Sequence, residues 1–354
     1  MDTMHMEGQA MASTSSQSYV YVGQAGETVP GREVRTGLFR SLAGEGSWES
    51  ITAGLPSEPQ VRALAVHPKQ PNVVLAGTQD GIYRSDDHGG HWERLSAPKP
   101  GLAVWSLQFH PRDPDVIFAG YEPYAIYRSE NAGKSWDRLP MDVTFPDVTV
   151  RPVVTPKRIL GIAIDPAYPT EMYAAVEVGG LLRSLNGGEK WESVSEGYYV
   201  NDDPVDMHGV AVSGAQPRTV FTIGRIGMWR SPDRGEHWQH VQLEMLSPRG
   251  TYCRDILVAP DDLRTMYCAA GPAFRSEEGA LFCSHDSGQS WSRMDLGTKP
   301  KSTMFAVDID PRNSMDIYCA TSGGEVFYSR DKGVTWKSNP LPAGANQVYS
   351  LAVG

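Results

Sequence analysis

The stretch Ser329-Arg330-Asp331-Lys332-Gly333-Val334-Thr335-Trp336 decides the fold, because versions of it recur seven times along the chain. Each copy begins with serine and closes with tryptophan, and the closing residues are Trp48, Trp92, Trp136, Trp191, Trp238, Trp291 and Trp336. Successive tryptophans are 44 to 55 residues apart. A repeat of this length is typical of propeller blades and solenoid coils.

The chemistry of the phrase predicts a tight turn between two short strands. Its aspartate can accept backbone N–H groups, and its glycine can adopt the positive φ that other residues resist. Asparagine, which can make the same turn bonds, replaces the aspartate at Asn131 and Asn186. The first copy has Ala43 and Glu45 where aspartate and glycine belong, so we expect its turn to be the least ordered.

This pattern resembles the Asp-box, or BNR, repeat of sialidases, two-propeller xyloglucanases, sortilin-type receptors and photosystem II assembly factors. The resemblance covers nearly the whole chain and implies an all-β, seven-bladed β-propeller with Asp-box turns. It does not imply one activity, since a fold of this kind hosts many. Sialidases resemble six-bladed rings with an Arg-Ile-Pro motif, and xyloglucanases use a cleft between two propellers, so neither reaction is inherited with the repeat.

The repeats and the chain ends predict how the ring closes. In one repeat, residues 61–67 form the innermost strand, 73–77 the second, 81–84 the third and 92–95 the outer one. Residues 347–354 match an innermost strand, whereas 19–23 and 37–51 match the other three strands of a blade. We therefore expect the C-terminal strand to join the N-terminal blade. Residues 1–17 form a tail in this interpretation, and 18–354 form one propeller domain.

Composition and charge restrict the partners. The chain of 354 residues contains 36 glycines, 26 prolines and 40% hydrophobic residues, which suits a β-rich globular protein. Its formal net charge of -10 argues against nucleic acid or an anionic membrane as a partner. The first eighteen residues are polar, which favours a cytoplasmic location. A closed ring has no free sheet edge, so we expect a monomer.

The four cysteines lack metal or redox spacing. Cys268 and Cys319 align with Leu75 and Phe118 of other repeats, so we expect them to be buried strand residues. No trio of residues has metal-ligand spacing, and we expect neither a metal nor a cofactor. The acidic run Asn201-Asp202-Asp203 could hold calcium, but a solvated turn explains it better.

Alignment of the seven innermost strands locates the candidate site. Two columns are apolar throughout, and the column two residues before them is mixed: Arg62, Trp105, Leu160, His208, Arg254, Phe305 and Tyr349. The column another two residues earlier, whose side chains should point the same way along the strand, is also mixed: Gln60, Ala103, Arg158, Asp206, Tyr252, Thr303 and Gln347. The column facing the axis holds small residues except at Asp255. The mixed columns lie where innermost strands start, at the channel mouth opposite the repeated turns.

Loops between second and third strands should open on the same mouth. They carry Gln79, Tyr121, Glu122, Tyr124, Glu177, Arg225, Arg275, Glu277 and Glu278. The longest loop, 23–37, carries Glu27, Arg32, Glu33 and Arg35, and its length suggests a lid.

These residue types predict a site for a small anionic or polyhydroxylated ligand, because arginine holds carboxylate, sulfate or phosphate by paired hydrogen bonds. The predicted ligand-binding residues are Arg62, Arg158, Arg254, Trp105, Tyr252, Phe305, Tyr121, Arg225 and Arg275. Asp206 and His208, two apart on one strand, should point the same way and suit proton transfer. Further proton-transfer candidates are Tyr349, Asp255 and Glu122.

Three interpretations of the mouth remain open. The first is a hydrolase or lyase acting on a small anionic or sugar-derived substrate. The second is a propeller without catalysis that binds a ligand or assembles with a protein. A third gives the mixed columns a structural role, in which Arg62, Asp206, Arg254 and Asp255 form a ring of salt bridges between blades. Catalysis requires a proton-transfer group that no arginine holds.

Overall fold

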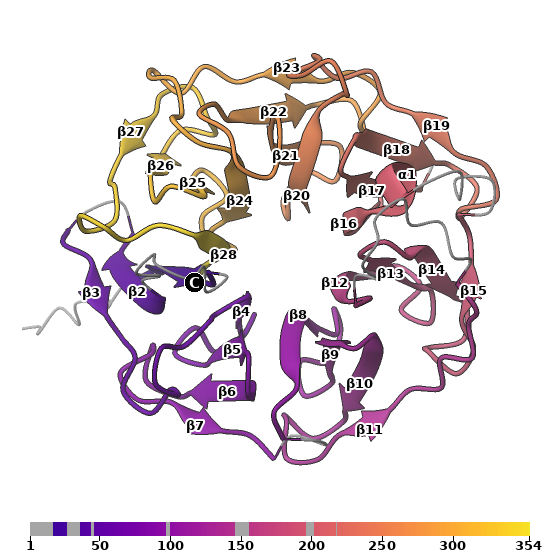
Figure 1. Ribbon diagram of the computed structural model, residues 1–354, viewed down its shortest axis with the longest axis horizontal. Coiled ribbons are helices and arrows are strands. Elements are labelled where there is room, and N and C mark those ends of the chain that lie inside the picture. The colour runs from indigo at the N-terminus through magenta and orange to yellow at the C-terminus, as the bar shows by residue number, and fades with distance from the viewer. Residues whose placement is uncertain are drawn as a thin grey trace, which may run out of the picture.

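The computed structural model describes residues 17–26, 36–43, 46–96, 100–145, 156–195, 202–216 and 218–354. Within these ranges the strands form seven antiparallel sheets of four strands each. Figure 1 shows the sheets arranged around one central axis, so the protein is an all-β, seven-bladed propeller, as the repeat predicted.

Each blade contributes one strand to each of four concentric positions. The innermost strands are β4 (Ala63–Val66), β8 (Ala103–Phe109), β12 (Ile159–Ile164), β16 (Met207–Ser213), β20 (Tyr252–Val258), β24 (Met304–Ile309) and β28 (Val348–Val353). The second strands are β5 (Val74–Thr78), β9 (Ile117–Glu122), β13 (Met172–Val176), β17 (Thr219–Gly224), β21 (Met266–Gly271), β25 (Ile317–Thr321) and β1 (Tyr19–Gln24).

The remaining strands lie farther from the axis. The third strands are β6 (Gly81–Ser85), β10 (Ala125–Ser129), β14 (Gly180–Ser184), β18 (Gly227–Ser231), β22 (Ala280–Ser284), β26 (Val326–Ser329) and β2 (Gly37–Leu42). The outer strands are β7 (Glu93–Arg94), β11 (Asp137–Arg138), β15 (Glu192–Ser193), β19 (Gln239–His240), β23 (Ser292–Arg293), β27 (Lys337–Ser338) and β3 (Glu49–Ser50). A short helix, α1 (Asp202–Val205), precedes β16. In the described ranges, no helix is long and apolar enough to cross a membrane.

The two chain ends share one blade, as the sequence predicted. The C-terminal β28 pairs with β1 in the sheet order β28-β1-β2-β3. The Tyr19 amide donates to the Gly354 carbonyl at 2.8 Å, and the Gly354 amide donates back to Tyr19 at 3.0 Å. The last strand of the chain therefore holds the first strand in the ring.

The repeated turns connect third and outer strands and are built by one serine and one aspartate. The Ser85 hydroxyl accepts the Gly89 amide at 2.7 Å and donates to Asp87 Oδ1 at 2.7 Å. The same Oδ1 accepts the His91 amide at 2.9 Å. Both Gly89 (φ 88°) and the preceding His88 (φ 59°) are left-handed, so the turn needs two such residues rather than the predicted one. Glu45 of the divergent first copy lies outside the described residues.

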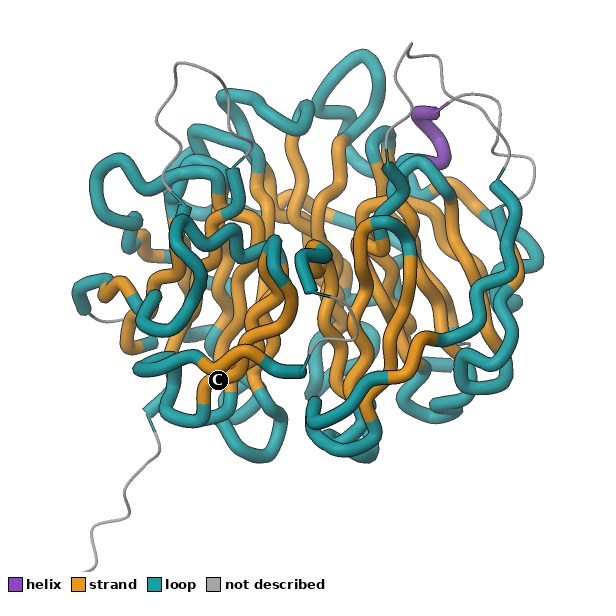
Figure 2. Tube along the Cα trace, turned by 60° about the horizontal axis from the view of Figure 1, so that its bottom comes forward, coloured by secondary structure: helices purple, strands orange, loops and turns teal. Residues whose placement is uncertain are grey.

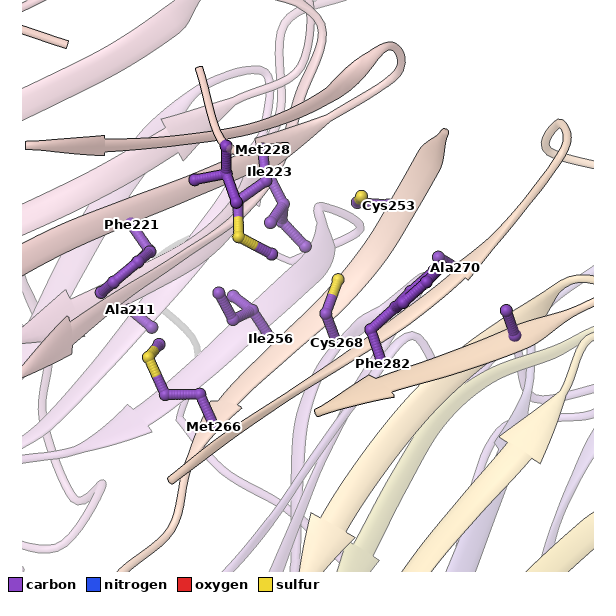
Figure 3. Packing of buried hydrophobic residues seen from close by; sticks show 12 residues of the cluster. Ala211, Phe221, Ile223, Met228, Cys253, Ile256, Met266, Cys268, Ala270 and Phe282 are labelled. Carbon is purple, nitrogen blue, oxygen red and sulfur yellow. The ribbon is translucent and has the colours of Figure 1, made fainter. Parts of the chain in front are cut away.

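The hydrophobic core lies between neighbouring blades. Figure 3 shows one such layer, in which Phe221 and Met228 of β17 and β18 pack with Cys268 and Phe282 of β21 and β22. Phe221 and Phe282 are at most 1% exposed, and burial of each stabilises the fold by about 1.5 to 3 kcal/mol. Cys268 and Cys319 are fully buried, which confirms their prediction as strand residues.

Candidate functional site

Six innermost strands carry a bulge near their start, and the bulged residue belongs to the mixed sequence column. In β8, Val104 pairs with Tyr121 and Ser106 pairs with Gly120, so Trp105 has no partner across the ladder. The corresponding bulged residues are Leu160, His208, Arg254, Phe305 and Tyr349. A bulge redirects a side chain relative to the strand alternation. It therefore explains why this column leaves the core.

The seventh innermost strand has an equivalent arrangement just before its first residue. The Arg62 amide donates to the Gly77 carbonyl at 2.9 Å, and Ala63 pairs with the same Gly77. The residues directly before the seven mixed-column positions are each at most 2% exposed: Val61, Val104, Ile159, Met207, Cys253, Met304 and Val348. The core thus continues past the bulge with its alternation shifted by one residue.

The redirected side chains surround two connected spaces. The first is a channel of about 310 Å³ along the axis, lined by the mixed column and by the small residues predicted to face the axis. The second, which we call the mouth cavity, has a volume of about 560 Å³. Trp105, His208, Arg254 and Tyr349 line both spaces. The mouth cavity includes Asp203 of α1, the helix on one rim of the ring in Figure 2.

The mouth cavity brings together many of the predicted site residues. Those that line it are Trp105, Arg158, Asp206, His208, Arg225, Tyr252, Arg254, Arg275 and Tyr349. It is also lined by Ser247, Arg249 and Phe274, which alignment of the strands missed. Ser247 and Arg249 lie in the loop between β19 and β20, and Phe274 lies in the loop between β21 and β22. The sequence signal for Phe274 was its position next to Arg275, and only Arg275 was predicted to bind a ligand.

Arg158 is held by two carboxylates. Its Nε donates to Glu122 Oε2 at 2.8 Å and its Nη1 to Glu177 Oε2 at 2.8 Å. The same Glu122 oxygen accepts the Trp105 indole N–H at 3.0 Å. Glu122 does not line the mouth cavity, so its position suits holding Trp105 and Arg158 in place rather than the predicted proton transfer. Burial raises the pKa of Glu177 even though Arg158 opposes the shift.

A second group joins Arg225, Asp206 and His208. Arg225 Nε lies 3.0 Å from Asp203, and its Nη1 lies 3.6 Å from Asp206 Oδ2. His208 Nε2 lies 3.6 Å from Asp206 Oδ1. His208 Nδ1 contacts the Cys253 carbonyl oxygen at 2.7 Å, and this oxygen can only accept, so Nδ1 carries a proton. The other ring nitrogen, Nε2, faces Asp206.

Two arginines of the mouth cavity contact rings instead of carboxylates. The Arg254 guanidinium lies 4.9 Å from the Phe305 ring centroid and 5.4 Å from that of Tyr349. The Arg275 guanidinium lies 5.4 Å from the Phe274 centroid. Neither arginine forms an ion pair with any described carboxylate. Within the described ranges, they thus differ from Arg158 and Arg225, which are held by carboxylates.

Three predicted site residues lie in the channel below the mouth cavity. Arg62 donates to Gln60 and stacks on Trp105, with its guanidinium 4.7 Å from the ring centroid. Phe305 is 2% exposed and supports Arg254. The Asp255 carboxylate accepts the backbone amides of Ile256 at 2.9 Å and Val307 at 3.0 Å.

The structure corrects the placement of Tyr121. Its side chain is fully buried in the blade and packs edge-on against Tyr127, with ring centroids 4.9 Å apart. Tyr121 therefore cannot contact a ligand at the mouth, and burial raises its pKa. The predicted lid residues Glu27, Arg32, Glu33 and Arg35 lie outside the described residues, as does Asn201 of the acidic run. Across the described part of the chain, no group of acidic, histidine or cysteine side chains could hold a metal ion.

Polar side chains in the channel link four pairs of neighbouring blades, which differs from the predicted ring of salt bridges. Ser106 Oγ donates to the Ile159 carbonyl at 2.8 Å, and Ser350 Oγ donates to that of Val61 at 3.1 Å. Asp308 Oδ2 accepts the Val353 amide of the C-terminal strand at 2.9 Å. Burial raises the pKa of Asp308 to about 7. These contacts resemble the Asp255–Val307 link and are made to the backbone.

Comparison with known proteins gives propeller relatives at low identity. No family model matches the chain. The oligoxyloglucan-reducing end-specific xyloglucanase of Emericella nidulans is 25% identical over 332 residues, covering 78% of this chain and 40% of that protein. Vacuolar protein sorting/targeting protein 10 of Fusarium vanettenii is 22% identical over 289 residues, covering 73% of this chain and 18% of that protein.

Solved structures agree on the fold. A GH74 xyloglucanase from Xanthomonas campestris superimposes with a TM-score of 0.62 and 19% identity, covering 84% of this chain and 47% of that one. The structure of YCF48 bound to D1 peptide has a TM-score of 0.57 and 17% identity, covering 88% of both chains. The chain thus spans less than half the length of these xyloglucanases but most of the length of YCF48.

Proposed function

We propose that the mouth cavity binds a small anionic or sugar-derived substrate and hydrolyses it. The observation that carries this proposal is the contrast among the arginines of one cavity. Arg158 and Arg225 neutralise neighbouring carboxylates, whereas Arg254 and Arg275 have no described carboxylate partner. A purely structural network would pair every one of these arginines with a carboxylate. Guanidinium groups left without a carboxylate suit an incoming carboxylate, sulfate or phosphate.

His208 is the group best placed to accept a proton in this cavity. Its Nδ1–H is held by the Cys253 carbonyl, which leaves Nε2 to take a proton from an attacking water molecule. Asp206, 3.6 Å from Nε2, would stabilise the imidazolium that results. Tyr349 lines the same cavity, and its hydroxyl would supply the proton for the leaving group.

The relatives support hydrolysis as the reaction class. The xyloglucanases named above are glycoside hydrolases of related propeller architecture. Their match extends over only part of their length, so the single ring described here would have to supply its own binding and catalytic groups. The mouth cavity, with its aromatic and charged lining, contains groups of both kinds.

The test measures binding before activity. Isothermal titration calorimetry with benzoate, D-glucuronate and a neutral xyloglucan heptasaccharide would be done on the wild type, Arg254→Gln and Arg84→Gln. Arg84 pairs with Asp86 beside a repeated turn and serves as the matched control. Loss of a charged hydrogen bond at Arg254 should weaken carboxylate binding about 10- to 100-fold. Binding of none of these ligands, or equal binding in Arg254→Gln, would contradict the proposal.

A second candidate function is ligand or peptide binding without catalysis. It is favoured by the ion pairs of Glu122, Glu177 and Asp206 with arginines, which reduce the number of available acids. YCF48, bound to a peptide in its solved structure, matches nearly the whole chain. Turnover of a bound glycoside that disappears in His208→Gln while binding persists would favour the enzyme. Tight binding without any turnover would favour the second candidate.

A further inference from the structure

We infer that the ligand of the mouth cavity is an aryl carboxylate, meaning a planar aromatic ring that carries a carboxylate group. This inference rests on the proposed function and narrows its substrate class. The evidence is the geometry of the aromatic side chains in the cavity together with the position of arginines that no described carboxylate neutralises.

A continuous series of rings lines the mouth cavity, and we call it the aromatic arc: Trp105, Tyr349, Phe274 and Tyr252. The Trp105 and Tyr349 centroids are 6.1 Å apart at 66°, and those of Tyr349 and Phe274 are 6.4 Å apart at 67°. The Phe274 and Tyr252 centroids are 6.3 Å apart at 70°. Every neighbouring pair is thus edge-to-face. The arc ends at His208, whose ring lies 4.6 Å from that of Tyr252.

This arrangement favours an aromatic guest over a saturated sugar ring. Aromatic rings attract each other when the positive edge of one meets the negative face of another. Because successive rings of the arc are turned by roughly 70°, the cavity lining offers both ring edges and ring faces. A planar aromatic ligand can use both at once, whereas a sugar ring gains mainly from one flat face.

The arginines without described carboxylate partners contact this arc. Arg254 lies over Tyr349, and Arg275 lies over Phe274. Arg249, which lines the same cavity, forms no ion pair with any carboxylate of the described ranges. A carboxylate attached to a ring held by Tyr349 and Phe274 would therefore meet guanidinium groups that can bind both of its oxygens.

The acidic residues of the cavity are paired with arginines. Glu177 is paired with Arg158 at 2.8 Å, and Asp203 is paired with Arg225 at 3.0 Å. Asp206 lies 3.6 Å from the same Arg225. With Glu122, four carboxylates share these two arginines. The five arginines that line the cavity therefore exceed the four carboxylates by one formal positive charge. The volume of about 560 Å³ accommodates a fused two-ring ligand.

The experiment separates the ring from the charge with four probes. Calorimetry on the full chain would compare 2-naphthoate, its uncharged analogue 2-naphthamide, its saturated analogue decahydronaphthalene-2-carboxylate, and D-glucuronate. We expect 2-naphthoate to bind at least about 10-fold more tightly than 2-naphthamide. We expect it to bind about 5-fold more tightly than the saturated acid, which lacks edge-to-face contacts.

Variants locate the binding. Arg254→Gln should weaken 2-naphthoate binding about 10-fold or more and leave 2-naphthamide binding unchanged, whereas Phe274→Leu should weaken both aromatic probes. Arg84→Gln should change neither. Phe274 lies in a loop between β21 and β22, so this variant keeps the inference testable if Arg254→Gln fails to fold. Thermal melting would confirm that each variant is folded.

Outcomes distinguish this inference from the proposed function. Tighter binding of D-glucuronate than of 2-naphthoate, lost in Arg254→Gln, would overturn the aromatic assignment and keep the anionic site. Equal affinity for 2-naphthoate and the saturated acid would do the same. Absence of binding by every carboxylate, or binding that Arg254→Gln and Phe274→Leu leave intact, would overturn both.

Discussion

Deletion of residues 347–354 tests whether ring closure supports the whole fold. The deletion removes β28, in which Val348, Leu351 and Val353 are between 0 and 9% exposed. At about 2 kcal/mol for each buried side chain, they contribute about 6 kcal/mol. The backbone bonds between β1 and β28 add to this, each by about 1 kcal/mol. Proteins of ordinary stability have only about 5 to 15 kcal/mol in total.

The truncated chain should therefore be unfolded or aggregated at 25 °C, since it also exposes the edge of β1. Circular dichroism melting and size-exclusion chromatography would detect both outcomes. Val334→Ser, at a side chain that is 79% exposed, is the control and should behave as the wild type. Leu351→Ala should give an intermediate effect of about 2 to 4 kcal/mol. A melting temperature unchanged by the deletion would refute the closure argument.

Three further predictions concern the site, the channel and the turns. His208→Gln should lower turnover about 100-fold or more while ligand affinity measured by calorimetry stays within about 3-fold; an unchanged rate would remove His208 from the chemistry. The free energy of unfolding should fall as pH rises from about 4 to 7, because burial raises the pKa of Asp308 to about 7 and the unfolded chain releases that proton earlier. In Asp308→Asn, the free energy of unfolding from urea melts should depend less on pH across this range. A pH dependence identical to that of the wild type would show that the Asp308 carboxyl is not its cause. Gly89→Ala should destabilise the protein by about 1 kcal/mol more than Gly101→Ala in thermal melts, since both have positive φ but only Gly89 has a neighbour, Ile51, at 2.5 Å from the new Cβ; equal losses would show that the turn can relax.

The seven-bladed ring was predictable from the repeat, and its closure was predictable from the strand patterns at the two chain ends. The tryptophan of each turn fixes one blade, and the unmatched strand at residues 347–354 has one available partner. The mixed column was also identifiable, since Arg62, His208 and Arg254 interrupt an apolar series. Its cause was not predictable, because a bulge depends on pairing with the second strand and leaves no residue signature of its own.

The partners of the charged residues were beyond the sequence. Arg158 and Arg254 occupy neighbouring columns, yet only Arg158 reaches carboxylates, because Glu122 and Glu177 belong to adjoining second strands and loops. Tyr121 was misplaced because it and Glu122 alternate along β9, so one faces the blade interior while the other faces Trp105. Phe274 and Arg249 lie in loops whose paths are set by tertiary packing.

The bulge also separates two roles of the innermost strand, namely packing in the core and lining the channel. The residue before it stays in the core and the residue after it faces the axis, while the bulged side chain itself is constrained by neither. The seven mixed-column positions, six of them bulged, line one channel from seven blades. A substitution at one of them alters the lining of the channel while the adjacent core positions are preserved. The residues that line the channel can therefore be replaced one blade at a time while the buried residues that stabilise the fold are kept.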